Sequence, residues 1–297
     1  MAIILRHLLF TRALRHVKPR QHMTKLQAAL STNTDYPNPH QRGPLARIDD
    51  TLCEEEWGPA KVKKGASRWG FALYRCAYDA KYDNNWKRML DLINSEVVDS
   101  LELEERMDLL STHQLSIIED PARFEGATSH QLREHFSKIW VPNEVTRILR
   151  DPSHRTCRVY GPDGVNDKPV DSYMGPRYTH CLFADEICLE SLDETSTRPV
   201  IKALIVDWEQ TAPEWYQRNS YKVCDDHGYE DGLTDYWAED VGWMYIEVYR
   251  YVEWFDKFTE PWDWDLWYRR PPDLGFSSLP GMVPGEWRKK GRSAASG

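Results

Sequence analysis

The clearest pattern of apolar and polar positions in this chain begins at Trp69. Residues 69–78 form a run of aromatic and aliphatic side chains, of strand length, with apolar groups at both odd and even positions. Such a run is typical of a strand covered on both faces, as in the centre of a sheet. The polar residues 79–85 predict a turn, in which Asp83 or Asn84 has the side chain to cap a following helix.

Apolar residues then recur at helical spacing, which predicts an amphipathic helix with one buried stripe: Trp86, Met89, Leu90, Ile93 and Val97. The pattern at 101–110 fits helix or loop equally well. A second strand is predicted at His113–Glu119, because Asp120-Pro121 ends the run.

Thr128 and Gln131 match the capping box that opens many helices. The helix behind them is expected to stop at Val141-Pro142, because a proline disfavours helical backbone in the residue before it.

The second half reads mainly as strands separated by polar segments. The pattern predicts strands at 156–160, 178–191 with a break near Asp185-Glu186, 200–208 and 242–248, a helix at 250–258 and an aromatic turn at 261–272. Residues 209–240 are polar, acidic and rich in Trp, which indicates a long insertion. No glycine-rich phosphate loop follows the first strand, so a doubly wound dinucleotide fold is not expected.

The order of elements predicts an α+β fold. Its sheet should be antiparallel or mixed, with helices mainly on one face and ferredoxin-like elements. The predicted domain spans residues 68–272. A basic leader at 1–34 and a linker at 35–67 precede it, and a disordered basic tail at 273–297 follows.

Charge is unevenly distributed along the chain. The formal net charge is −9, which argues against nucleic acid as the main partner. Residues 1–34 hold six Lys or Arg and no acid, a composition seen in mitochondrial transit peptides, although a disordered leader is the simpler interpretation. The sequence leaves open whether translation starts at Met1 or Met23.

Cysteine usage and hydropathy indicate the compartment. The six cysteines form no C-x-x-C motif, and no glycosylation sequon or long apolar stretch is present. These features predict a cytoplasmic protein without a membrane span, with mitochondrial import through residues 1–34 as the alternative.

Candidate catalytic groups lie where predicted strands begin or end. Glu119 ends one strand and Asp207 ends another, so two carboxylates would flank one cleft edge if those ends are neighbours. Capping of strand ends by solvated acids is the simpler interpretation. His180 lies beside Cys181, but adjacent strand residues point to opposite faces, so His180 reads more simply as a half-buried sheet residue.

Candidate metal ligands lie in the acidic insertion. Asp225, Asp226 and His227 are ligand types that suit a divalent metal, but their spacing matches no zinc or EF-hand template. An acidic surface loop is the simpler interpretation. The sequence indicates no cofactor.

Several motifs together resemble a large group of uncharacterised proteins from filamentous fungi. The matching segments are WGFALYRCAY at 69–78, EDPARFEGAT at 119–128, HCLFADEICLESL at 180–192, and GWMYIEV at 242–248 with a later RPP at 270–272. The resemblance covers roughly residues 68–272 and implies one compact domain there. It brings no established activity, so it assigns no catalytic residue.

Two functional hypotheses follow. The first is a soluble intracellular binding or scaffold protein that contacts an unknown protein or small molecule, because aromatic residues and acids are abundant and common catalytic signatures are absent from the sequence. The second is a small-molecule enzyme without a nucleotide cofactor, working through a carboxylate or a histidine in a pocket at one end of the sheet.

Overall fold

The computed structural model describes most of the predicted domain and short parts outside it. The described residues are 43–52, 55–57, 62–64, 68–150, 175–195, 198–209, 232–233, 236, 239–259, 263–275 and 283–288. The chain divides into two compact units, residues 1–43 and 44–297. The second unit contains the sheet described below.

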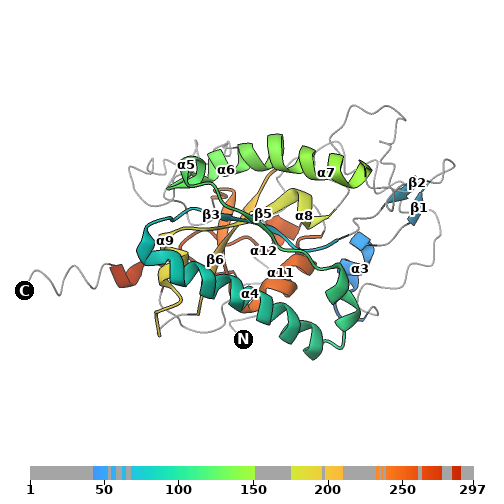
Figure 1. Ribbon diagram of the computed structural model, residues 1–297, viewed down its shortest axis with the longest axis horizontal. Helices are drawn as coiled ribbons and strands as arrows, with labels where there is room; N and C mark the ends of the chain where they lie inside the picture. The colour runs from blue at the N-terminus through green and yellow to red at the C-terminus, as the bar shows by residue number, and fades with distance from the viewer. Residues whose placement is uncertain are drawn as a thin grey trace, which may run out of the picture. The chain divides into compact units, whose positions relative to one another are not determined.

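A five-stranded mixed sheet forms the centre of this unit (Figure 1). Its order is β4-β3-β5-β6-β7, with bounds Ser116–Ile118, Ala72–Arg75, His180–Ala184, Val200–Ile205 and Trp243–Glu247. β3 runs parallel to β4 and β5, whereas β6 is antiparallel to both β5 and β7. The predicted mixed sheet is confirmed. The ferredoxin-like arrangement is not confirmed, because β3 and β4 are direct parallel neighbours.

The segment from β3 to α4 (Asp83–Leu103) follows its sequence pattern closely. All four residues of β3 are buried, and α4 buries Trp86, Met89, Ile93 and Val97 on one stripe. The expected caps are wrong. A 3-10 turn, η3 (Ala80–Tyr82), precedes α4, and Asp79 caps that turn by accepting a hydrogen bond from the backbone N–H of Lys81.

Helices cover both faces of the sheet, which corrects the expectation of helices mainly on one face. Phe71 packs edge-on against Tyr251 and Phe255 of α11 (Tyr251–Lys257). Tyr74 packs against Phe124, which ends α5 (Pro121–Phe124), and its hydroxyl shares a hydrogen bond with His135. Residues three apart on a strand point to opposite faces, so the apolar groups on both faces of β3 require helices on both sides. Figure 1 shows α6 and α7 on one side and α4 and α11 on the other.

The second helical layer is continuous from Ser129 to Arg150. It consists of α6 (Ser129–His135), a π-helical segment (Phe136–Trp140) and α7 (Val141–Arg150). The capping box of Thr128 and Gln131 is confirmed. The predicted stop at Val141-Pro142 is wrong. The π-helical segment changes the backbone hydrogen-bond spacing just before Pro142, which accommodates a residue that has no N–H to donate.

The long strand predicted at 178–191 is three elements. α8 (Pro176–Thr179) leads into β5, and α9 (Glu186–Glu190) follows it. Asp185 accepts a hydrogen bond from the backbone N–H of Cys188 and so caps α9, which explains the break in the apolar pattern. The aromatic turn predicted at 261–272 contains a short helix, α12 (Asp263–Trp267). The strand expected at 156–160 and most of the acidic insertion lie outside the described residues.

Some described residues outside 68–272 contact the helices around the sheet. α3 (Ala46–Leu52) is held at its start, where the backbone N–H groups of Arg47 and Ile48 donate to Asp256 of α11. Near the other end, Trp287 and Arg288 donate hydrogen bonds to Glu190. β1 (Glu55–Trp57) and β2 (Val62–Lys64) form a separate hairpin.

No helix within the described ranges is long and apolar enough to cross a membrane.

An ion pair that includes Lys202 of β6 lies over aromatic residues of β5 and β7. The Lys202 ammonium is 2.8 Å from the Asp185 carboxylate and 4.2 Å from the centre of the Trp243 ring. Burial raises the pKa of Asp185, but the charge of Lys202 and its hydrogen bond outweigh that effect and hold this pKa below its usual value. The pair therefore stabilises the sheet when both groups are charged.

Replacing Asp185 by Asn leaves a mostly buried ammonium without its counter-charge. We expect Asp185→Asn to lower the free energy of unfolding by about 3 kcal/mol, measured by urea denaturation at pH 7. Asp79→Asn is the control, because the Asp79–Lys81 pair is exposed and contributes little. Equal effects of the two substitutions would contradict this interpretation of the pair.

Candidate binding site

The two carboxylates suggested by sequence do not share a cleft. Glu119 directly follows β4, at the end of the sheet where β3 and β5 also end. β6 runs in the opposite direction, so Asp207 lies at the other end, where the backbone N–H of Val206 donates to Thr179 just before β5. The acid–base pair that an enzyme would need at one edge is therefore not formed by these residues.

Glu119 is part of an ion cluster around Arg75. The Arg75 guanidinium is buried, and its two terminal nitrogens contact Glu119 at 3.5 Å and Asp83 at 2.5 Å. Its Nε donates to the carbonyl of Ala77, and the guanidinium lies 4.8 Å from the centre of the Tyr78 ring. Glu119 therefore helps to neutralise a buried cation, which is a structural role.

His180 is buried on the α11 side of the sheet. Its ring stacks on Phe258 with centroids 4.5 Å apart and an interplanar angle of 5°. Nδ1 shares a 2.9 Å hydrogen bond with the hydroxyl of Thr179. Burial lowers the pKa of His180 to about 3, so the imidazole is neutral at physiological pH. His180 is therefore a sheet histidine, as the simpler sequence interpretation expected, but it is buried and not half-buried.

The candidate metal ligands Asp225, Asp226 and His227 lie outside the described residues. Within the part of the chain that the structure describes, no three His, Cys, Asp or Glu side chains come together as metal ligands. No metal is therefore assigned to the described sheet.

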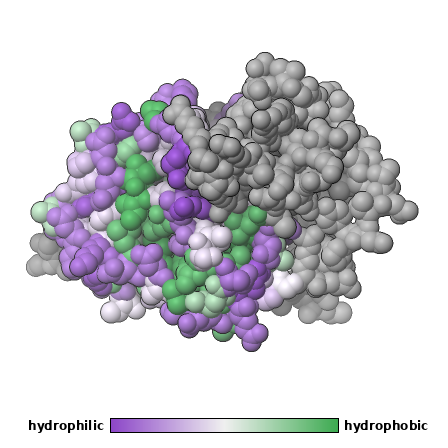
Figure 2. Space-filling model, turned by 45° about the vertical axis from the view of Figure 1, so that its right-hand side comes forward, coloured by the Kyte–Doolittle hydropathy of each residue, from purple (hydrophilic) through white to green (hydrophobic). Residues whose placement is uncertain are grey.

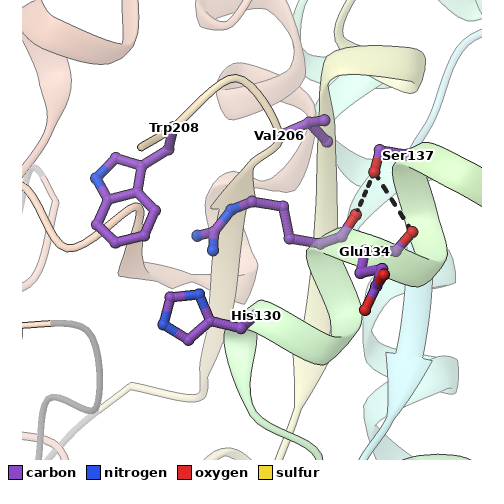
Figure 3. A pocket seen from close by; sticks show the side chains of 6 residues that line it. His130, Glu134, Ser137, Val206 and Trp208 are labelled. Carbon is purple, nitrogen blue, oxygen red and sulfur yellow. Dashed lines mark hydrogen bonds between the residues drawn. The ribbon is translucent and has the colours of Figure 1, made fainter. Parts of the chain in front are cut away.

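An open pocket of about 330 Å³ lies instead between α6 and the end of β6 (Figure 3). Its lining residues are His130, Arg133, Glu134, Ser137, Val206 and Trp208. The first four lie at spacings of three, four and seven, which places them on one face of the helix. Asp207, a sequence candidate, is exposed between the last two lining residues. None of the six lining residues was predicted from the sequence as a site residue.

Arg133 joins the helix to the sheet at this pocket. Its side chain is buried, and it donates from Nε to the carbonyl of Ile205 at 3.0 Å and from a terminal nitrogen to the carbonyl of Gly242 at 3.2 Å. The guanidinium lies 4.5 Å from the centre of the Trp208 ring. These contacts fix a positive charge and an indole side by side in the pocket wall.

Gly242 makes this close approach possible. Its φ is +74°, and a Cβ atom there would lie 2.5 Å from an Arg133 nitrogen and 2.6 Å from the Trp208 ring. Any side chain would therefore displace one of the two groups. The packing of Arg133 against Trp208 therefore requires a glycine directly before β7.

Asp240 supports the same wall from behind. Its backbone carbonyl accepts a hydrogen bond from Nε1 of Trp208 at 3.1 Å, and its carboxylate accepts from the N–H of Gly242 at 2.7 Å and from Nε1 of Trp264 at 2.9 Å. Burial raises the pKa of Asp240 to about 6, against the lowering effect of those two hydrogen bonds. Arg133 is the nearby cation that also lowers this pKa.

The residue types in the pocket resemble a catalytic triad, but their geometry does not. The Ser137 hydroxyl donates to the backbone carbonyls of Arg133 at 2.8 Å and of Glu134 at 3.4 Å, and Figure 3 marks both bonds with dashed lines. Glu134 accepts a hydrogen bond from Lys138, which lowers the pKa of that carboxyl. His130 is seven residues from Ser137, about 10 Å along a helix, so it does not activate the hydroxyl.

Comparison of the chain with protein-family models, with curated proteins and with solved structures gives no match. The functional assignment therefore depends on the geometry of the pocket. The resemblance to fungal proteins stays a prediction from the motifs.

Ionisation of Asp240 should make stability depend on pH in a defined direction. The pKa of its carboxyl is higher in the folded chain than in the unfolded chain, so its contribution to stability is complete below about pH 4 and is lost as pH rises through 6. Asp240→Asn removes this loss and keeps an acceptor for Gly242. We expect the stability of the variant relative to wild type to rise by about 2 kcal/mol between pH 4.5 and 7.5.

Urea denaturation at a series of pH values between these limits measures that difference. Asp207→Asn is the matched control, because it removes one exposed carboxylate nearby and leaves Asp240 in place. A constant difference between wild type and Asp240→Asn would contradict the assignment.

Proposed function

We propose that this chain is a binding protein whose site is the pocket of Arg133, His130 and Trp208. The observation that carries the proposal is the fixed guanidinium beside the indole, at the wall of an open pocket. The hydroxyl and carboxylate in the pocket are engaged by helix neighbours, so they supply no nucleophile or paired base. What the site offers a ligand is charge and aromatic surface.

The ligand that this wall favours is a small planar molecule with a carboxylate group. Trp208 and His130 present two rings with centroids 5.8 Å apart, which suits contact with a flat apolar group. The nearby positive charge of Arg133 favours an anion over a neutral group of the same shape. The volume of about 330 Å³ is at the lower end of ligand pockets.

The cellular setting of this function is proposed from the sequence. We propose a cytoplasmic protein related to the fungal group whose motifs it shares, with the mitochondrion as the alternative through residues 1–34. Fluorescent fusions with and without those residues distinguish the two compartments.

Aromatic carboxylates should stabilise the folded chain, whereas their carboxamides should not. We expect benzoate, 1-naphthoate and indole-3-carboxylate to raise the melting temperature, and the matched amides to bind about tenfold more weakly because they lack the charge that Arg133 favours. Trp208→Leu should abolish the shifts. Differential scanning fluorimetry gives the first readout, and calorimetric titration the affinities.

Tyr249→Leu is the matched control, because Tyr249 is an exposed aromatic residue that does not line the pocket. Equal shifts in both variants would place the binding elsewhere. Chemical conversion of a bound compound, followed by mass spectrometry, would replace the binding assignment with an enzymatic one.

A further inference from the structure

A separate feature of the surface lies where α4 ends. Leu103 is 81% exposed, Met107 41% and Leu110 36%. Met107 and Leu110 belong to η4 (Met107–Thr112), a 3-10 helix, in which side chains three apart lie on the same face. We call Leu103, Met107 and Leu110 the apolar corner. Figure 2 shows exposed hydrophobic side chains among hydrophilic ones on the described surface.

The apolar corner is set among acids. Residues 96–110 contain one basic residue, Arg106, and six acidic residues: Glu96, Asp99, Glu102, Glu104, Glu105 and Asp108. Arg106 is engaged with Asp49 at 2.6 Å and with Asp108 at 3.0 Å. The segment around the apolar corner therefore presents a negative field to solvent.

Two of these acids, Glu102 and Glu104, lie at the carboxyl end of α4, against the preference of the helix. The carboxyl end of a helix carries a partial negative charge, so acids there lower its stability and bases raise it. α4 has no basic residue in its last turn. The acidic corner is therefore not explained by the stability of α4.

Glu105 breaks a second local rule. The helix ends in a Schellman motif, in which the N–H of Arg106 donates to the carbonyl of Leu101 and the N–H of Glu105 to that of Glu102. The residue in the position of Glu105 has φ +56°, a conformation that favours glycine. An acid occupies that position at a cost in stability. Acids at the end of α4 and a non-glycine residue with positive φ both lower stability at this exposed corner. Local sequence choices that lower stability are expected at functional surfaces, which indicates an interaction here.

We infer that the apolar corner docks an amphipathic segment of a partner protein that carries Lys or Arg around an apolar stripe. The exposed Leu and Met side chains supply contact area, and the surrounding acids select the charge. Nucleic acid and anionic membranes are repelled by the same acids. This surface is distinct from the pocket, and its test does not depend on the proposed ligand.

A fluorescent helical peptide of Leu and Lys is the probe, and a peptide with Glu in place of Lys is its control. The full chain should bind the Leu–Lys peptide at least about tenfold more tightly, with affinity falling as salt is added. The triple variant Leu103→Ser, Met107→Ser, Leu110→Ser should lose at least about tenfold in affinity. Ile139→Ser with Leu266→Ser should lose none, because these residues are exposed elsewhere.

Glu105→Gly separates binding from folding. Glycine relieves the strained backbone, so we expect the melting temperature to rise by roughly 2–4 °C. The loss of one acid should weaken binding of the Leu–Lys peptide by about twofold to fivefold. A purely structural corner would show the rise in stability without the loss of binding.

Three results would overturn the inference. Equal affinity for the two peptides would show that the surrounding acids do not select a basic partner. Unchanged affinity in the triple variant would show that the peptide binds at another surface. Concentration-dependent self-association that the triple variant abolishes, measured by analytical ultracentrifugation, would assign the corner to a second copy of this chain.

Discussion

The burial of β3 on both faces is the constraint on which the rest of the structure depends. Phe71 and Tyr74 point to opposite sides of the sheet, and each meets aromatic residues of a different helical layer. A strand with apolar groups on both faces is stable only when both faces are covered. Helices α4 and α11 cover one face of the sheet, and α6 and α7 cover the other (Figure 1). Parallel neighbours on both edges complete its hydrogen bonding.

The pocket is a consequence of how the second layer is attached. α6 must be fixed to the antiparallel part of the sheet, and Arg133 does this by donating to carbonyls at the end of β6 and the start of β7. The same side chain stacks on Trp208, and Gly242 leaves room for both. The hydroxyl of Ser137 and the carboxylate of Glu134 are engaged in hydrogen bonds within the helix, and the guanidinium and the indole form the adjoining wall.

Sequence reasoning predicted the features that depend on local pattern. The buried run at 69–78, the stripe of α4 and the capping box at Thr128 are each encoded by neighbouring residues. The pocket could not be found that way, because Arg133 and Trp208 are far apart in sequence and meet only through the order of strands. Asp240 is one acid among many, and only burial distinguishes it. A sequence signal that could have pointed to the pocket is Gly242, because a glycine directly before the apolar run of β7 indicates a close backbone approach.

The indole N–H resonance of Trp208 reports directly on whether a ligand occupies this pocket. This group donates to the carbonyl of Asp240 behind the pocket wall, so a ligand that contacts the ring should change its chemical shift. During titration with 1-naphthoate, we predict a saturable shift of the Trp208 signal, with the signals of the buried Trp69 and Trp254 unchanged. Binding of 1-naphthoate that leaves the Trp208 resonance in place would contradict the proposed site.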